Sequence, residues 1–223
     1  RAQCGLPEGP QSPDAEAGQA IHAAWCDQPT RSLTLEEQDI LDTLRSKELE
    51  ILRWWNPDKH PFSEYRERRL WHEWQVTAEG VLRCSGQADV IYLDPPRALI
   101  LDGKTGHKAV MTEASNLQLR TLAALLAVNG QRLCGKQINE VTVALVQEWR
   151  AANSACVYDV GALLRALREM ELNVEACYAP AAPRIPSPEA CEHCRAKGTC
   201  REFAKAALPG PCLADAMPVE QHV

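Results

Sequence analysis

The sequence predicts an α/β fold in which a mixed sheet is flanked by helices, and two observations indicate it. Two short apolar runs, residues 90–93 and 98–101, are separated by the turn-forming residues Asp94-Pro95-Pro96, as in two paired strands. The chain then follows a helix–strand–helix order, which is typical of helices packed on a sheet. No linker divides the 223 residues into balanced halves. We therefore expect one domain over residues 1–207 and a loose tail over residues 208–223.

Apolar periodicity predicts two helices before the central runs. The first covers residues 15–26, and Ser12 or Asp14 can cap it. The second covers residues 34–55 and begins with a Thr-x-x-Glu capping box. It is amphipathic, so we expect a scaffold helix without chemistry of its own. Its expected core face is Ile40, Leu41, Leu44, Ile51 and Leu52, and its expected water face is Glu36, Glu37, Asp42 and Lys47.

The segment between the second helix and the central runs alternates between polar and apolar residues. We expect strands at residues 65–71, 74–78 and 81–85, with a turn at Glu79-Gly80 between the last two. Together with the two central runs, these strands would form an antiparallel meander.

After the central runs, the pattern returns to helices with one further strand. Ser115 or Asn116 caps a helix over residues 117–128, and Gly130 and Gly135 are expected in the connection that follows. A strand over residues 141–149 would join the sheet beside the strand that leads to Asp102. The last helix covers residues 160–177, with Leu163, Leu164, Leu167 and Leu172 expected to face inward.

Charged residues follow the second apolar run directly. Residues 98–101 lead into Asp102-Gly103-Lys104, and strand side chains alternate between faces, so Asp102 and Lys104 project to the same side. If the strand that contains Asp89 pairs beside them, a second carboxylate joins the group. Such a site could hold a divalent cation with a lysine next to it, which is a geometry suited to phosphodiester cleavage.

The pattern G-x-x-D at Gly86–Asp89, followed thirteen residues later by D-x-K, resembles the core of the PD-(D/E)XK nucleases, in particular the RecB-like exonuclease branch. The resemblance implies a restriction-endonuclease-like core in which Asp89, Asp102 and the Gly103 carbonyl bind Mg²⁺ or Mn²⁺. Lys104 would position or deprotonate the attacking water, or stabilise the charged phosphorane. The implied activity is metal-dependent hydrolysis of DNA by an exonuclease that acts on single-stranded ends.

Two further segments resemble motifs of this branch. Gly18-x-x-x-His22 resembles the opening motif, whose histidine adds a ligand to the catalytic metal, and a neutral imidazole suits Mn²⁺ better than Mg²⁺. Gln118 resembles the start of a Q-x-x-x-Y motif, which implies a hydrogen bond near the metal-bound water or the DNA backbone. Leu122 stands at the tyrosine position, so any contribution of that tyrosine is absent. Glu67 is a further carboxylate that could support the metal site from a neighbouring strand, and the interpretation does not depend on it.

The cysteine content indicates metal binding more than disulfides, because nothing in the chain points to an oxidising compartment. Three of the ten cysteines are clustered as Cys191-x2-Cys194-x5-Cys200. Three close thiolates occupy three positions of a tetrahedral site or a cluster, and a fourth ligand must come from elsewhere. The residues themselves leave open an iron-sulfur cluster, a zinc knuckle or reduced thiols.

In the RecB-like exonucleases, including the CRISPR-associated enzymes and AddB-type subunits, this spacing joins one cysteine near the N-terminus to hold a [4Fe-4S] cluster. The resemblance implies Cys4 as the fourth ligand and a clip that joins the two chain ends. Cys26 is the next candidate for that ligand, and Cys177 and Cys212 follow it.

Charge and hydropathy bear on the partners and the location of the protein. A net charge of -6 argues mildly against a nucleic-acid partner, although local basic patches can still bind DNA. No apolar run approaches a membrane span, and the N-terminus lacks a signal-peptide layout, so we expect a cytoplasmic protein. The family resemblance implies a bacterial or phage-infected cell. The candidate DNA contacts are Arg66, Arg68, Arg69, Lys108, Arg195 and Lys197.

An alternative from a different functional class is an iron-sulfur or zinc subunit of a recombination or replication complex that binds single-stranded nucleic acid without cutting it. The missing tyrosine and the acidic net charge favour this alternative. The presence of the complete set His22, Asp89, Asp102 and Lys104 argues against it, since a binding module has no use for that set.

Overall fold

The structure is a computed structural model that describes residues 12–77, 80–105, 111–148, 154–179, 182, 185–187, 191, 194 and 197–207. The chain divides into two compact units, residues 12–179 and a second unit that combines residues 1–11 with 180–223. Within the described residues, no helix combines the length and the apolar character that a membrane crossing requires.

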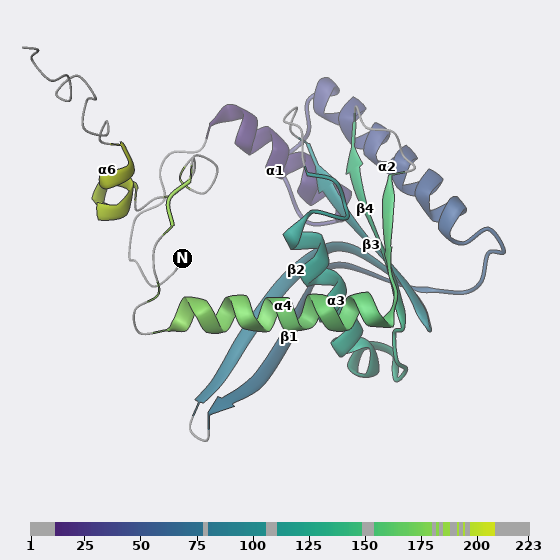
Figure 1. Cartoon of the computed structure of the whole chain (residues 1–223). Helices are drawn as coiled ribbons and strands as arrows, with labels where there is room; N and C mark the ends of the chain where they lie inside the picture. The colour runs from purple at the N-terminus through teal and green to yellow at the C-terminus, as the bar shows by residue number, and fades with distance from the viewer. Residues whose placement is uncertain are drawn as a thin grey trace, which may run out of the picture. The chain divides into compact units, whose positions relative to one another are not determined.

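The unit of residues 12–179 is built on a mixed sheet with the strand order β1-β2-β3-β4-β5 (Figure 1). Its described strands are β1 (Ser63–Thr77), β2 (Gly80–Asp94), β3 (Arg97–Lys104), β4 (Glu140–Gln147) and β5 (Ala155–Tyr158). Strands β3 and β4 are parallel, and the other neighbouring pairs are antiparallel. The predicted mixed sheet, its antiparallel meander and the strand beside that of Asp102 are therefore confirmed.

Strands β1 and β2 are longer than the sequence pattern predicted. The expected strands 65–71 and 74–78 form one strand as far as Thr77, with Ala78 and the predicted turn residue Glu79 outside the described residues, and the runs 81–85 and 90–93 also form one strand. The antiparallel pairing of β1 with β2 extends along almost their whole length, so ladder hydrogen bonds continue where the apolar alternation is interrupted. Strand β5 was not predicted, because four residues are too few to show a period.

The helices of this unit are α1 (Pro13–Trp25), α2 (Leu35–Trp55), α3 (Leu117–Cys134) and α4 (Val160–Tyr178). Ser12, Thr34 and Asn116 cap the first three, and Thr34 forms the predicted capping box with Glu37. Helix α3 continues past its predicted end. Gly130 lies inside it, where a Cβ would come within 2.7 Å of Ile138, and Gly135 ends it with a φ of 69°.

Helices cover both faces of the sheet near its centre (Figure 1). Strand β3 is buried on both sides, as its unbroken apolar run predicted. Two core clusters share the side chains of β2 and β3 in alternation. Ile91, Leu93, Ala98 and Ile100 pack with α3 and α4, whereas Val90, Tyr92, Leu99 and Leu101 pack with α1 and α2.

Two predicted helix faces need correction. Leu164 and Leu172 of α4 are 61% and 48% exposed, because the inward stripe runs through Leu163, Ala166 and Met170 at helical spacing. Glu37 of α2 is buried instead of facing water. Its carboxylate accepts a hydrogen bond from the Thr34 amide and forms an ion pair with Arg31. These two interactions compensate the cost of removing the carboxylate from water.

The second unit contains a 3₁₀ turn at Lys197–Thr199 and the short helix α6 (Arg201–Ala207). Within it, Cys191 is buried and Cys194 is exposed. Cys4 and the predicted tail over residues 208–223 lie outside the described residues. The single domain over residues 1–207 stays a prediction.

Candidate active site

The site forms where β2 and β3 separate. Their pairing ends at Val90 opposite Leu101, so Asp89 and Asp102 lie just beyond the last paired residues. The Gly103 amide donates a hydrogen bond to Asp89 Oδ2 at 2.8 Å. The Asp89 carboxylate of β2 thus takes the place of a backbone acceptor for the Gly103 amide. It thereby lies next to Asp102 at the end of β3.

Asp102 and Lys104 project to the same side, as strand alternation predicted. Lys104 Nζ lies 2.6 Å from Asp102 Oδ2, and Asp102 is only 1% exposed. From α3, Gln118 Nε2 donates a hydrogen bond to Asp102 Oδ1 at 3.0 Å. Burial raises the pKa of Asp102, and the Lys104 ammonium opposes that rise. The carboxylate is therefore oriented by an amide and an ammonium.

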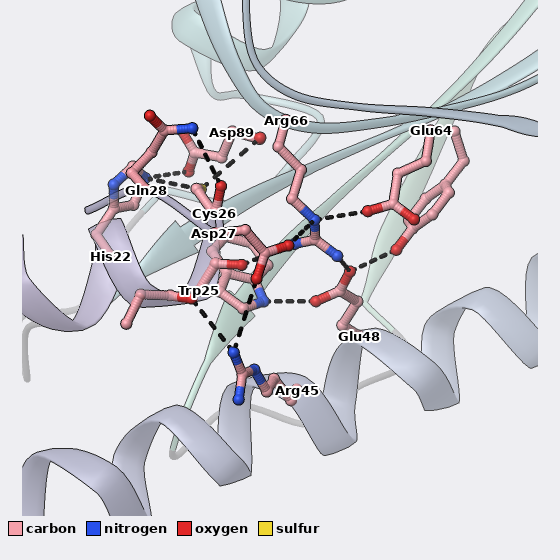
Figure 2. Close-up of polar contacts among 12 residues, drawn as sticks. His22, Trp25, Cys26, Asp27, Gln28, Arg45, Glu48, Glu64, Arg66 and Asp89 are labelled. Carbon is pink, nitrogen blue, oxygen red and sulfur yellow. Dashed lines mark hydrogen bonds and ion pairs between the residues drawn. The ribbon is translucent and has the colours of Figure 1, made fainter. Parts of the chain in front are cut away.

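Helix α1 brings His22 to the Asp89 carboxylate (Figure 2). His22 Nε2 lies 3.2 Å from Asp89 Oδ2. The hydrogen bond to Asp89 raises the pKa of His22 and outweighs the opposing effect of burial. One turn earlier, a Cβ on Gly18 would come within 2.8 Å of Thr105 Oγ1. Glycine at this position therefore lets α1 approach the end of β3.

Trp25, at the end of α1, packs directly on Gly103. A Cβ on Gly103 would come within 2.3 Å of the Trp25 ring, closer than any side chain atom can lie. Glycine between Asp102 and Lys104 is therefore a packing requirement, because it lets the indole hold α1 over the end of β3.

Glu67 belongs to the site more closely than the sequence suggested. Its Oε1 lies 3.6 Å from His22 Nε2, and its backbone has a φ of 51°. That left-handed conformation is uncommon for a residue with a side chain and costs on the order of 1 kcal/mol. The β1–β2 ladder contains Arg66 opposite Val90 and Arg68 opposite Ala88, with no Glu67–Asp89 pair between them. The interrupted ladder leaves both carboxylates on the side of His22.

The donor set fits a divalent cation. Among the described residues, Glu67 Oε1 and Asp102 Oδ2 are buried oxygens that face cationic or potentially cationic groups, His22 Nε2 at 3.6 Å and Lys104 Nζ at 2.6 Å. Carboxylate oxygens are the ligands that Mg²⁺ prefers, and an imidazole beside them suits Mn²⁺. The residues present would therefore accommodate either ion.

Cys26 lies beside His22 and Asp89 (Figure 2). Its Sγ, His22 Nε2 and Glu67 Oε1 all lie within 4.8 Å of one another. The thiol is fully buried and donates a weak hydrogen bond to the Asp89 carbonyl at 3.8 Å. Burial, followed by the charges of Asp89 and Glu67, raises the pKa of Cys26. The sequence had ranked this cysteine second to Cys4 as the fourth cluster ligand, and the structure places its sulfur beside the candidate cation site.

A thiol in this position should make the site sensitive to thiophilic metals. We expect Cd²⁺ to displace Mn²⁺ from this site, and Cys26→Ser to raise the Cd²⁺ concentration that this requires by about 10–100-fold, because one soft ligand is lost. Cys134→Ser is the matched control, since Cys134 Sγ donates to the Gly130 carbonyl on α3 and has no contact with the site. Equal Cd²⁺ sensitivity of Cys26→Ser and the wild type would contradict this expectation.

A buried carboxylate on α2 links the elements that carry the site (Figure 2). Glu48 is 4% exposed and accepts hydrogen bonds from Trp25 Nε1 at 2.5 Å, from Arg66 Nη2 at 2.7 Å and from the Tyr92 hydroxyl. Arg66 also donates to the Trp25 carbonyl at 2.8 Å. These bonds tie α1, β1 and β2 together. The scaffold helix therefore carries a polar network that the sequence analysis missed, although Glu48 interrupts an otherwise apolar helical repeat.

The candidate DNA contacts lie in different surroundings. Arg66 is engaged by Glu48, Glu64 and Asp27, so its charge is balanced within the protein and we do not carry it forward as a DNA contact. Arg69 donates to Ser85 Oγ and Gln87 Oε1 and remains exposed, and the Arg68 guanidinium lies over the Tyr65 ring. Lys108, Arg195 and the side chain of Lys197 lie outside the described part of the chain.

Comparison with known proteins adds one strong match. A family model described as the PD-(D/E)XK nuclease superfamily matches residues 2–201. No curated protein matches the chain. Solved structures that resemble it include one described as the crystal structure of SSO0001, with 15% sequence identity and a TM-score of 0.37, covering 73% of this chain and 68% of that chain. A TM-score this low does not establish a shared fold.

Proposed function

Because the chain belongs to the PD-(D/E)XK nuclease superfamily, we propose that it is a deoxyribonuclease that uses Mg²⁺ or Mn²⁺ to hydrolyse phosphodiester bonds. The observation that carries this proposal is the convergence of two carboxylates, an imidazole and an ammonium where β2 and β3 separate. An acidic pair beside an ammonium combines cation binding with charge stabilisation.

The residues have distinct proposed roles. Asp89 and Asp102, with His22 and the Gly103 carbonyl, would hold the cation. The bound cation would supply positive charge and lower the pKa of a coordinated water. Lys104 would position the attacking water or stabilise the charge that develops on the phosphate oxygens. Gln118 fixes the orientation of the Asp102 carboxylate through its hydrogen bond.

We further propose that the substrate is an end of single-stranded DNA, as the resemblance to RecB-like exonucleases implies. One motif of that branch is incomplete here. Leu122 is 2% exposed and packs against Gly86. A Cβ added to Gly86 would lie 2.7 Å from Leu122 Cδ2. This position therefore serves the core, and Gln118 is the part of the motif that reaches the site.

The cysteine cluster remains part of the proposal. Cys191, Cys194 and Cys200, with Cys4, would hold a [4Fe-4S] cluster, for which the spacing and the family resemblance are the support. The Phe203 amide donates to Cys200 Sγ at 3.5 Å, and amide hydrogen bonds to sulfur suit a metal-bound thiolate. Within the described residues, the three sulfurs do not form a group whose ligand atoms all lie within 4.8 Å.

Iron content tests the cluster directly. We expect anaerobically purified protein to be brown and to contain about four iron atoms per chain. Cys194→Ser should lose the colour and the iron, whereas Cys134→Ser, at a cysteine whose Sγ donates to the Gly130 carbonyl within α3, should keep both. If the protein is colourless and contains zinc, the cysteines hold zinc and the iron-sulfur proposal is wrong. If it contains neither metal, both the iron-sulfur and the zinc assignments are wrong.

Cleavage of labelled single-stranded DNA in Mn²⁺ and in EDTA tests the enzyme assignment. We expect shortening only with Mn²⁺ and none with Asp102→Asn, which keeps the side chain's shape but removes its charge. Asp42→Asn, at an exposed position of α2, is the control. Binding without cleavage by the wild type in Mn²⁺ would overturn the nuclease proposal in favour of a non-cleaving nucleic-acid-binding subunit.

A further inference from the structure

One face of the β1–β2 ribbon carries an exposed tryptophan with cations on both sides. On the N-terminal side of Val90, β2 no longer pairs with β3. There β1 and β2 continue as a two-stranded ribbon (Figure 1). On one face of it, His72 and Trp74 hydrogen-bond to Glu171 and Glu175 of α4. Alternation places Trp71 on the opposite face.

The surroundings of Trp71 are those of a base-stacking surface. The residue is 42% exposed, although a large aromatic side chain is usually more buried. The guanidinium carbons of Arg69 and Arg83 lie 6.0 Å and 5.9 Å from the centroid of its ring. Arg69 is held in place by hydrogen bonds to Ser85 and Gln87, while Arg83 makes a 2.8 Å ion pair with the exposed Glu73.

This face is continuous with the candidate active site. Gln87 accepts a hydrogen bond from Arg69 and donates one to Glu67, which lies beside His22. Trp71 is paired with Ser85, four residues along β2 from Asp89. At about 3.3 Å per residue, the ring lies about 13 Å along the strand from the candidate metal ligand. That separation matches a few nucleotides of an extended strand.

We propose that the ribbon face formed by Arg69, Trp71, Arg83 and Gln87 binds single-stranded DNA whose scissile end lies in the active site. One base stacks on Trp71, and the phosphates on either side of it contact Arg69 and Arg83. A single strand fits because its bases can leave their neighbours and stack on protein rings, whereas duplex bases are already paired and stacked. The inference rests on the proposed function, since it assigns a path to that substrate.

Local charge supports this choice of ligand. The chain as a whole carries a net charge of -6, so binding of a polyanion depends on local cationic groups. Arg69 and Arg83 supply two guanidinium groups at the only exposed tryptophan on this face of the described ribbon. Glu73 faces the same surface and neutralises part of the charge of Arg83. The stacking ring is therefore expected to contribute more than either arginine alone.

The test is binding of fluorescently labelled single-stranded DNA by the full chain in EDTA, measured as anisotropy so that cleavage does not interfere. We expect Trp71→Ala to weaken binding by about tenfold or more, the effect of losing one stacked base, and Trp71→Phe to retain most of it. Arg83→Ala should weaken binding less and lower its salt dependence. Trp54→Ala, at a 55% exposed tryptophan on α2, is the matched control and should bind like the wild type. All variants should melt like the wild type.

The outcomes separate this inference from the nuclease proposal. If Trp71→Ala binds single strands like the wild type while the wild type cleaves DNA in Mn²⁺, the ribbon inference is wrong and the nuclease assignment stands. If Trp71→Ala loses binding but the wild type does not cleave, the ribbon face is supported and the nuclease assignment fails. Equal loss of duplex and single-strand binding in Trp71→Ala would overturn the stacking role.

Discussion

Replacing Lys104 with alanine is expected to lower the rate of DNA cleavage by about 10³-fold, with little change in the binding of single-stranded DNA or Mn²⁺. The physical reason is the position of the ammonium. Lys104 Nζ lies 2.6 Å from Asp102 Oδ2, next to the proposed ligands without being one of them. Its charge would therefore act mainly on the reacting water and phosphate, so its loss should affect the chemical step.

Single-turnover cleavage in Mn²⁺, together with anisotropy measurements in EDTA, separates the two effects for Lys104→Ala. Lys136→Ala, at an exposed lysine beyond the end of α3, is the control for loss of a positive charge. A Lys104→Ala protein, purified free of contaminating nuclease, that cut DNA at the wild-type rate would refute the assignment. A loss of Mn²⁺ binding equal to the loss of rate would instead place Lys104 in the support of the metal ligands.

Replacing Glu48 with alanine is expected to destabilise the protein by about 3 kcal/mol, which for a domain of this size lowers Tm by about 6–12 °C. Glu48 accepts hydrogen bonds from Trp25, Arg66 and Tyr92 inside the protein. Its carboxylate raises the pKa of Arg66 against the opposing effect of burial. Removal of the carboxylate would leave a largely buried guanidinium without its main partner, and that loss is the largest part of the cost.

Thermal unfolding of Glu48→Ala measures this effect, with Glu50→Ala as the control at an exposed position of the same helix. The double variant Glu48→Leu with Arg66→Leu should recover part of the lost stability, because both charges are removed together. A Glu48→Ala protein that melted like Glu50→Ala would show that the network contributes nothing to stability.

Part of the site was accessible from local sequence patterns. The apolar run before Asp102 predicted a buried strand, and alternation placed Asp102 and Lys104 on the same side of it. Helix periodicity and capping residues located α1, α2 and α4 to within a few residues.

Other parts of the site had no local signal strong enough to find them. Cys26 follows His22 by four residues, a spacing that places both on one side of α1, but the position of its sulfur beside Glu67 of β1 depends on how α1 packs on the sheet. The positive φ of Glu67 interrupts a strand whose alternation looks ordinary in the sequence. Glu48 stood in an apolar repeat and could have been noticed, but its partners Trp25, Arg66 and Tyr92 come from three other elements.

The sequence by itself determined the alternation of β3, the capping of the helices and the order of the chemical groups along the chain, because each depends on residues a few positions apart. Only the tertiary structure decided which groups surround the separation of β2 and β3. The close contact of Trp25 with Gly103 and the anchoring of α1 by Glu48 set the position of His22 and Cys26. Those distances arise from the packing of whole helices on a sheet, which no short stretch of sequence encodes.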